Sequence, residues 1–301
     1  MADRIRVAIL GTGNIGSDLA ERLLSSDDFL LVAVAGRRPE SSGLARLSSR
    51  VDLVSPSGLE GLRDLFGSIQ GFFDATSAND HPNHWFELKK EGKWVIDLTP
   101  SKIGKATVPV LAERYPELGF ADKPVANYSM VTCGGQSSAP VIAAIAESSK
   151  GIAEVEVSSS ISSDSAGPAT RRNIDNYVES TEHLAGRIAG TNRTKAILVL
   201  NPAEPPPLMR TTVTLKAEAI DLAAAIERTS QYVANTRQYV PGYELVLGPH
   251  FVAEGILSAT VSVKGEGYFL PAHAGNLDII NAAAVEVARR HSALHPGGRS
   301  A

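Results

Sequence analysis

The sequence contains a single cysteine, Cys133, among its 301 residues. One cysteine excludes an internal disulfide and any metal site built from several thiolates, and it is typical of proteins kept in a reducing compartment. We therefore predict a cytoplasmic protein with no metal site. Any thiol chemistry that this chain performs belongs to that one side chain.

Long apolar runs and long runs of like charge are absent as well. No segment approaches the roughly 18 consecutive apolar residues of a membrane-spanning helix. The first residues lead directly into an apolar segment, without the pattern of a secretory signal. The net charge is only −4, and no basic tract offers a nucleic-acid surface. We expect neither a membrane nor a nucleic acid as partner, and a hydrophobic content of 43% fits an ordinary globular chain.

A glycine motif follows the first apolar run. The segment Ile5–Leu10 precedes the motif, a helically spaced segment over 15–24 follows it, and a second apolar run covers Phe29–Ala35. Strand, glycine turn, helix and strand are the βαβ unit of a dinucleotide-binding fold, in which the turn holds the pyrophosphate. A tight structural turn is the alternative. The predicted cofactor contacts are Gly11, Thr12, Gly13, Asn14, Ile15 and Gly16.

Two more short apolar runs, Gly71–Asp74 and Trp94–Asp97, continue the predicted parallel sheet, and each ends in a polar loop. Open α/β sheets bind ligands at the carboxyl ends of their strands, so Ser77 in the first loop is a candidate cofactor contact. Asp74 and Asp97 are either catalytic carboxylates or groups that hydrogen-bond the loop backbone. The second interpretation is favoured.

From about residue 150 the pattern changes. The segment 152–161 alternates as a half-buried strand, and helical and strand-like segments follow without a βαβ rhythm. This predicts an antiparallel sheet that carries helices. The predicted fold class is therefore α/β, with a Rossmann dinucleotide-binding domain over 1–132, an α+β domain over 133–275 and a helix over 276–292.

Cys133 lies in the run Met130-Val-Thr-Cys-Gly-Gly-Gln136. A lone cysteine is often only a small buried hydrophobe. Here Ser137 or Ser138 is expected to cap a helix over 141–146, with Pro140 in its first turn, so that the positive end of the helix dipole lowers the pKa of the Cys133 thiol. Backbone N–H groups of the glycines would stabilise an oxyanion. Cys133 is thus the candidate nucleophile for acyl transfer through a thioester.

Further motifs stand in a recognisable order along nearly the whole chain, and with them the sequence resembles the acylating acetaldehyde dehydrogenases that partner a 4-hydroxy-2-oxovalerate aldolase. These motifs are Gly11–Gly16, Asp74–Ser77, Asp97–Pro100, Met130–Gln136, Ser165–Arg171 with Asn173–Asp175, Leu200–Pro206, Tyr239–Tyr243 and Ala274–Asp278.

The resemblance implies a two-domain architecture like that of glyceraldehyde-3-phosphate dehydrogenase, in which the second domain is catalytic and dimerising and the last helix packs back on the first. It implies NAD(P) as cofactor, CoA as cosubstrate, a homodimer and an aldolase partner. The implied reaction interconverts an aldehyde and its acyl-CoA, with Cys133 as the thioester nucleophile. Read without the family, the segment 165–170 is a turn and Asn276 a helix cap. The implied cofactor contacts are Ser165, Ala166, Gly167, Pro168, Ala169, Thr170, Arg171, Arg172, Asn173 and Asn276.

The chain departs from the family pattern where the second strand ends. NAD-binding folds usually place an acidic residue there to hold the ribose 2′-hydroxyl, and the family has Asp where this chain has Arg38. Two adjacent arginines, Arg37 and Arg38, suit a 2′-phosphate and so favour NADP. Solvated surface arginines are the alternative.

Two departures concern the candidate pocket. Thr211 occupies the position of a family Asp, and a threonine cannot act as a general base at neutral pH. After Gln136, whose amide is a further candidate for oxyanion stabilisation, Ser137 and Ser138 replace Ala and Thr, and Ala139 replaces a branched residue. If Ala139 faces the acyl pocket, acyl groups larger than acetyl are expected. If it faces the core, the change is only repacking.

Three rival functions remain open. A phosphorylating semialdehyde dehydrogenase would need a histidine base, for which His81, His84, His183, His250 and His273 are candidates in principle. A sugar-type oxidoreductase would use Lys123 of Asp122-Lys-Pro124 as acid and base. A non-catalytic, cofactor-binding subunit of an aldolase complex is the third.

Overall fold

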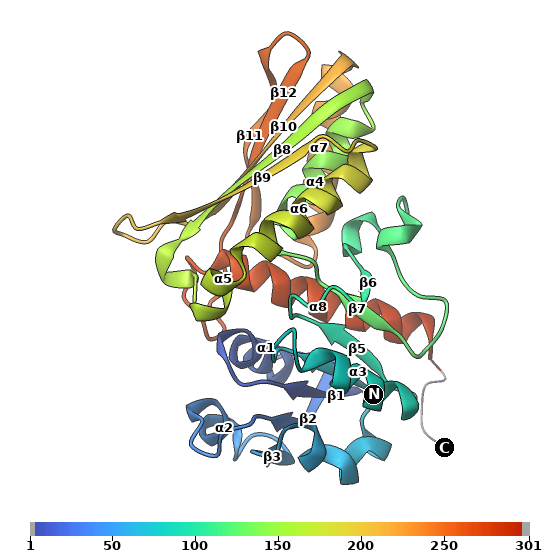
Figure 1. Ribbon diagram of the computed structural model, residues 1–301, viewed down its shortest axis with the longest axis vertical. Coiled ribbons are helices and arrows are strands. Elements are labelled where there is room, and N and C mark those ends of the chain that lie inside the picture. Colours follow the sequence, from blue (N-terminus) through green and yellow to red (C-terminus); the bar gives the residue numbers. More distant parts are fainter. Residues whose placement is uncertain (1–3, 297–301) are drawn as a thin grey trace. The chain divides into compact units, whose positions relative to one another are not determined.

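The computed structural model describes residues 4–296, apart from the side chains of Pro168 and Ala169. Its internal contacts divide it into two compact units (Figure 1). Unit 1 comprises the residues up to 107, residues 117–130 and those from 284 onward. Unit 2 comprises residues 108–116 and 131–283.

Unit 1 is built on a parallel seven-stranded sheet with the strand order β3-β2-β1-β4-β5-β7-β6. The βαβ unit expected around the glycine motif is present, as are the two later strands. The elements are β1 (Ile5–Leu10), α1 (Asn14–Leu24), β2 (Phe29–Ala35), α2 (Ser42–Leu47), β3 (Leu53–Ser55), the 3-10 helix η1 (Gly58–Ser68), β4 (Gly71–Asp74), α3 (His81–Lys90), β5 (Trp94–Asp97), β6 (Lys105–Ala106) and β7 (Asn127–Ser129).

The central strands β4 and β5 are apolar up to the Asp that ends each of them, because both faces of the sheet are covered. Every residue of β4 and β5 is buried. Phe73 packs edge-to-face on both Phe29 and Trp94, with ring centroids 6.5 and 6.1 Å apart. Gly71 leaves room for the Trp94 ring, since a β-carbon there would lie 2.1 Å from it. This packing fixes the strands whose carboxyl ends carry Asp74 and Asp97.

Unit 2 contains a five-stranded sheet with the order β11-β12-β10-β8-β9. Its pairs are antiparallel, as expected, except that β8 and β9 run parallel because α6 connects them. The elements are η2 (Pro109–Leu111), α4 (Cys133–Ala146), β8 (Ser149–Ser162), the 3-10 helix η4 (Ser163–Ser165), α5 (Pro168–Arg172), α6 (Ile174–Ala189), β9 (Thr194–Asn201), β10 (Met209–Ile220), α7 (Leu222–Arg237), β11 (Tyr243–Ala253) and β12 (Ile256–Val263).

The last helix, α8 (Gly275–Leu294), begins among the residues of unit 2 and continues into unit 1. Within unit 1 its residue His291 bonds two groups: Tyr128 donates its hydroxyl to Nδ1 at 2.8 Å, and Nε2 donates to the Pro124 carbonyl at 3.0 Å. Burial lowers the pKa of His291 to about 4, so the ring is neutral and fits this donor–acceptor pattern.

The sheet of unit 2 has one covered face. Helices α4, α6 and α7 pack on that face, where alternate residues of each strand are buried, such as Val155, Val157 and Val213. The residues between them point to the other face and are mostly serine, threonine and charged side chains. Within unit 2 no helix is drawn over that second face (Figure 1).

The start of α4 differs from the expectation. The helix begins at Cys133 rather than near residue 139, and Thr132 is its N-cap, with its hydroxyl accepting from the Gly135 N–H at 2.8 Å. Ser137 and Ser138 are therefore helical residues and not caps, and Pro140 lies inside the helix. Glycines disfavour helix on propensity alone, but here the Thr132 cap and the packing of the whole segment outweigh that preference.

Candidate active site

The glycine turn between β1 and α1 has the geometry that a pyrophosphate needs. Gly11 adopts φ 101°, and a β-carbon there would lie 2.5 Å from the Ala75 carbonyl oxygen. A β-carbon on Gly16 would lie 2.0 Å from the Gly11 carbonyl oxygen, so this glycine permits close helix–strand packing. No atom lies within 4 Å of the corresponding point on Gly13. The turn thus leaves one open approach, at the middle glycine, as a phosphate-binding turn requires.

The N-terminus of α1 faces that opening. Gly13 is its N-cap and supplies no side-chain acceptor, and Gly13 and Asn14 are exposed while Ile15 is half-buried. The positive end of the helix dipole therefore faces a site that an anion can reach. Thr12 anchors the turn by a 2.8 Å hydrogen bond between its hydroxyl and that of Ser41. These residues fit the pyrophosphate of a dinucleotide.

Arg37 and Arg38 follow the end of β2 and are exposed. Arg37 forms an ion pair with Asp80, with Nη1 3.1 Å from the carboxylate. Asp80 also accepts a hydrogen bond from the Ser77 hydroxyl at 2.6 Å. Two predicted cofactor contacts, Arg37 and Ser77, are thus joined through the carboxylate of Asp80, which was not predicted from the sequence to be a site residue. Arg38 lies beside this group on the same loop.

A buried cluster links the carboxyl ends of β4 and β5. His81 is fully buried and donates from Nδ1 to Asp74 at 2.9 Å, while its Nε2 lies 3.5 Å from Asp97 and 2.9 Å from the side-chain amide of Asn127. His84 donates to the same Asp74 oxygen at 2.8 Å. Each carboxylate also accepts from a loop N–H, of Thr76 or Thr99. The two Asp residues therefore hold their loops, as the favoured interpretation expected.

The charges in this cluster follow from its burial. Burial alone would raise the pKa of Asp74, but hydrogen bonds from His81 and His84 outweigh it, and the net pKa lies well below the usual value. Burial opposes charge on His81 too, yet the bond to Asp74 and the charge of Asp97 raise the pKa of His81. Burial raises the pKa of Asp97. A His81 imidazolium bonded to the Asp74 carboxylate is the state these shifts favour, with the Asn127 amide oxygen turned toward Nε2.

Cys133 is the first residue of α4 and is half-buried. It lies at the positive end of the helix, as expected, but the expected lowering of its pKa is wrong for the unliganded chain. Burial raises the pKa of the Cys133 thiol to about 12, against the opposing hydrogen bonds of the Gly134 and Cys133 N–H groups. Desolvation of a thiolate thus outweighs the helix terminus. The sulfur does lie near two backbone donors, as acyl transfer requires.

The four pocket candidates, Gln136, Ser137, Ala139 and Thr211, are at most 1% exposed. Ser137 and Thr211 meet: their hydroxyl oxygens are 2.8 Å apart. Thr211 also lies 3.1 Å from the Ser159 hydroxyl. The two departures from the family pattern at Ser137 and Thr211 are therefore neighbours in one hydroxyl chain. Complete burial of Ala139 in α4 favours the core interpretation of that residue.

The segment Ser165–Asn173 forms a compact connection between β8 and α6. Arg171 holds it by donating to the Ala166 carbonyl at 2.9 Å and to the Ser163 carbonyl at 3.0 Å. Ser165 and Ala166 are buried, while Arg172 is exposed and Thr170 is half-buried. Gly167 is the N-cap of α5, and the side chains of Pro168 and Ala169 lie outside the described residues.

Asn276, in the first turn of α8, is 1% exposed, and its Oδ1 has no hydrogen-bond partner among the described residues. A buried amide oxygen without a partner is costly, so its position fits an external amide donor such as the carboxamide of a nicotinamide. Among the described cofactor candidates in unit 2, Asn276 is the one whose buried side chain has an oxygen without a partner.

The histidines of unit 2 offer little to the phosphorylating rival. His183 is exposed on α6, His250 donates to the Gly248 carbonyl at 2.9 Å within β11, and His273 is half-buried in a turn before α8. Lys123, the residue that a sugar-type oxidoreductase would use, is exposed in an irregular segment of unit 1. Across residues 4–296 no group of three or more His, Cys, Asp or Glu side chains is arranged to hold a metal ion.

Solved structures with the same fold are aspartate semialdehyde dehydrogenases. The enzyme from Candida albicans, solved with NADP, aligns over 96% of this chain and 99% of its own with a TM-score of 0.63 at 10% identity. The Vibrio cholerae enzyme gives a TM-score of 0.58 at 15% identity, over 95% and 98% of the two chains. At 10 and 15% identity these structures show that the chain shares their two-domain fold.

The family follows from closer relatives. The chain is 42% identical to an acetaldehyde dehydrogenase of Pectobacterium atrosepticum, over 98% of both chains, and 45% identical to that of Spirochaeta aurantia, over 97% and 96%. Residues 133–271 match the dimerisation region of prokaryotic acetaldehyde dehydrogenases. The chain belongs to the acetaldehyde dehydrogenase family. None of its described helices has the length and apolar character needed to cross a bilayer.

Proposed function

We propose that the protein interconverts an aldehyde and its acyl-CoA through a thioester on Cys133. The observation that carries this is the position of Cys133 at the first residue of α4, where two backbone N–H groups approach the sulfur. The thiolate attacks the aldehyde carbonyl, and those donors stabilise the negative oxygen that forms. NAD(P), when bound, would supply the acceptor for the hydride that leaves the resulting thiohemiacetal. The CoA thiol then attacks the thioester and releases Cys133.

The side chain at position 211 shapes the second half of the reaction. Thr211 carries no charge and lies in a hydroxyl chain with Ser137 and Ser159. Hydroxyls stay protonated at neutral pH, so this chain orients hydrogen bonds rather than removing a proton from CoA. Position 211 therefore supplies no proton acceptor for the CoA thiol.

The direct test is to trap the intermediate. Wild-type protein is incubated with acetyl-, butyryl- and benzoyl-CoA in the absence of NAD(P)H, and the intact protein and its peptides are weighed by mass spectrometry. We expect one acyl group on Cys133 with release of free CoA. The acyl group taken up fastest also reports substrate size. A protein that turns over acyl-CoA without any adduct on Cys133 would contradict the proposal.

The cofactor is proposed to be NADP or to include it, because of Arg38. A 2′-phosphate held by one arginine gains about 1.5–3 kcal/mol, which corresponds to roughly tenfold to a hundredfold in affinity. We expect Arg38→Asp to weaken the binding of NADPH by that factor and to leave the binding of NADH unchanged or stronger. Cofactor titration followed by fluorescence measures both.

Arg237→Asp serves as the control for this substitution, because Arg237 is equally exposed but lies at the end of α7 in unit 2. It changes the net charge identically and should leave both cofactors unaffected. If the wild type strongly prefers NADH, the assignment of Arg38 to a phosphate is wrong.

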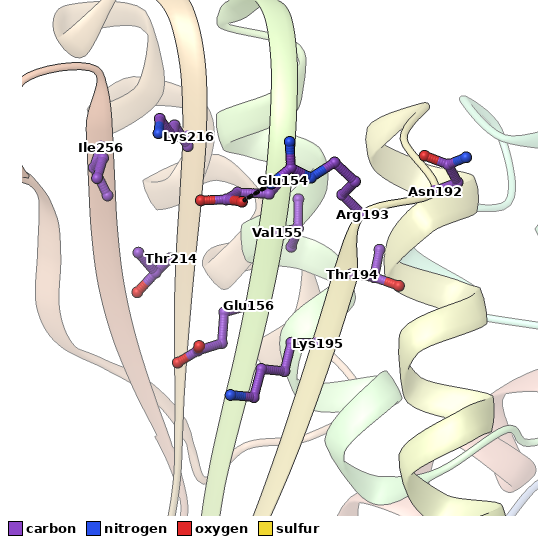
Figure 2. A pocket seen from close by; sticks show the side chains of 10 residues that line it. All are labelled: Glu154, Val155, Glu156, Asn192, Arg193, Thr194, Lys195, Thr214, Lys216 and Ile256. Atoms are coloured by element: carbon purple, nitrogen blue, oxygen red, sulfur yellow. Dashed lines mark hydrogen bonds and ion pairs between the residues drawn. The ribbon is translucent and has the colours of Figure 1, made fainter.

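The uncovered face of the sheet in unit 2 is proposed to bind a second copy of the chain. Hydroxyls cover its centre, with Thr212 bonded to Thr260 at 2.9 Å, and apolar side chains such as Val199 and Phe251 are exposed on the outer strands β9 and β11. Near β9 the face is hollowed over about 500 Å³, where Glu154 and Arg193 form an ion pair beside Lys195 (Figure 2). A face that carries both signs of charge can pair with itself across a two-fold axis.

We expect Thr212→Arg to convert a dimer to a monomer at micromolar concentration, since it places a large cation at the centre of this face. Size exclusion with light scattering gives the mass. Ser230→Arg, on the exposed side of α7, is the control and should stay dimeric. A Thr212→Arg protein that remains a dimer would place the interface elsewhere.

An aldolase that releases a reactive aldehyde is the proposed partner, because free aldehydes attack amines and direct transfer protects them. The family resemblance supports this partner. We expect co-expression with an aldolase encoded beside this protein to give one complex on size exclusion. Separate elution of the two proteins would indicate a stand-alone enzyme.

A cytoplasmic location is proposed because the Cys133 thiol stays reduced there.

A further inference from the structure

The hydroxyl of Tyr177 is a buried donor without an acceptor. Tyr177 lies on α6 and is 9% exposed, and its oxygen has no hydrogen-bond partner among residues 4–296. The Ser159 and Thr181 hydroxyls lie close enough to affect its pKa, but neither meets the geometry of a hydrogen bond to it. A buried donor without a hydrogen-bond partner destabilises the fold. The Tyr177 hydroxyl is therefore expected to have a function that offsets this cost.

The oxygen of Tyr177 lies against the residue that follows the nucleophile. A β-carbon on Gly134 would be 1.9 Å from that oxygen, so position 134 must be glycine for the hydroxyl to approach. The Gly134 N–H is also one of the two donors near the Cys133 sulfur. The phenol and the sulfur therefore border the same residue at the start of α4.

Neighbouring groups have other partners. The Thr181 hydroxyl donates to the Tyr177 carbonyl at 2.7 Å and meets Thr132 at 2.8 Å, and Ser159 meets Thr211. The Tyr177 hydroxyl lies within electrostatic reach of Cys133, and it forms no hydrogen bond to the sulfur in this structure. Burial, followed by the charge of a Cys133 thiolate, raises the pKa of Tyr177 far above its usual range. The phenol thus stays protonated and remains a donor.

The nucleophile needs such a donor. Two backbone N–H groups leave the pKa of the Cys133 thiol near 12, because burial dominates. At neutral pH a thiol of that pKa is almost entirely protonated and attacks slowly. A neutral donor next to the sulfur stabilises the thiolate without the repulsion or desolvation cost of a buried charge.

We propose that Tyr177 is a catalytic residue whose hydroxyl donates a hydrogen bond to the Cys133 thiolate, both before attack and when the thiolate leaves the thioester. The phenol keeps its proton throughout, and the thiol proton passes to water when the thiolate forms. This assignment rests on the proposed thioester function, and it adds a side-chain donor from α6 to the two backbone donors of α4.

The test is the pH dependence of Cys133 alkylation by iodoacetamide in the full-length protein, without acyl-CoA or cofactor. Cys133 is the sole cysteine of the sequence, so the rate reports one group. Because the pKa is near 12, the rate between about pH 7 and 9 follows the small thiolate fraction. We expect Tyr177→Phe to shift this rate profile upward by about one pH unit or more, which lowers the rate at each pH about tenfold or more. Its thermal stability should be unchanged or higher, because the substitution removes an unpartnered buried oxygen.

Tyr232→Phe is the matched control. Tyr232 is in α7 of the same unit and donates its hydroxyl to Glu147 at 2.8 Å, so the variant loses a bonded phenol away from the thiol. It should lose some stability and keep the wild-type alkylation profile. A matching upward shift in both variants, or none in Tyr177→Phe, would overturn the proposal. If Tyr177→Phe proves unstable, the hydroxyl is structural, which also overturns it.

Measuring steady-state turnover distinguishes a failure of the Tyr177 proposal from a failure of the proposed thioester function. With acyl-CoA and NAD(P)H, Tyr177→Phe should lower kcat about tenfold or more with little change in KM. A lower kcat with an unshifted alkylation profile would assign the hydroxyl to the oxyanion and contradict a thiolate donor. Absence of turnover in the wild type would refute the proposed function and leave the alkylation result intact.

Discussion

Cys133→Ala is expected to abolish acyl-CoA-dependent oxidation of NAD(P)H, with a loss of at least about a thousandfold, because no other side chain can form the thioester. Cys133→Ser should be equally inactive, since a serine hydroxyl in this buried setting is far less acidic than a thiol. The rate of NAD(P)H oxidation with acyl-CoA in excess measures both.

The control for these variants is cofactor binding. The glycine turn and Arg38 belong to unit 1, whereas Cys133 belongs to unit 2, so NAD(P)H affinity and thermal stability should match those of the wild type. An alanine variant that retained more than roughly 5% of the wild-type rate would exclude covalent catalysis at this residue.

From the sequence, Cys133 was expected in a glycine-rich turn that faces the N-terminus of a helix, whereas the helix itself begins at Cys133. Two glycines after Cys133 argue against helix, and two serines before Pro140 resemble a cap. The deciding contacts are tertiary. A β-carbon on Gly135 would lie 2.9 Å from Leu184 of α6, and one on Gly134 would strike Tyr177. The glycines are there for close packing against α6, which no local pattern reveals.

The same limit applies to the candidate pocket. Ser137 and Thr211 stood out as separate departures from a family pattern, although they are 74 residues apart in sequence and their hydroxyls are 2.8 Å apart in the fold. The hydroxyls of Ser137, Ser159 and Thr211 form one chain, so the departures at Ser137 and Thr211 are coupled in the fold. Ser159 itself carried no signal, because it looks like any other residue of the serine-rich β8.

Four strands of unit 1, β1, β2, β4 and β5, were predictable because apolar runs bounded by glycine and polar loops specify buried parallel strands. The short strand β7 (Asn127–Ser129) was not, because its three residues, Asn-Tyr-Ser, have no apolar run, and its pairing with β5 decides its conformation. The position of His81 could not be predicted from the sequence either. The sequence shows it as one histidine among several, and only the fold places it between Asp74 and Asp97.

His81→Leu is expected to destabilise unit 1 by about 1.5–3 kcal/mol, because it removes one donor from the buried Asp74 carboxylate, which keeps His84 and Thr76. Urea unfolding followed by tryptophan fluorescence measures this loss, and both tryptophans of the sequence, Trp85 and Trp94, lie in unit 1. The double variant His81→Leu/Asp74→Asn should recover part of the loss, since it removes the buried charge that has lost a donor. His183→Leu, on the exposed side of α6, should have no effect on this transition.

The pH dependence identifies the ion pair as the cause. The pKa of Asp74 is lowered in the fold, so its contribution is present above the unfolded value of about 3.9 and is lost as the pH falls through the folded value. The pKa of His81 is raised, so its contribution is present below the unfolded value of about 6.5 and is lost as the pH rises through the folded value. The stability difference between wild type and His81→Leu should therefore be largest between about pH 4 and 6.5 and should narrow in alkali. A difference independent of pH would mean that His81 acts by packing alone, and that the loops carrying Thr76 and Thr99 are held without its charge.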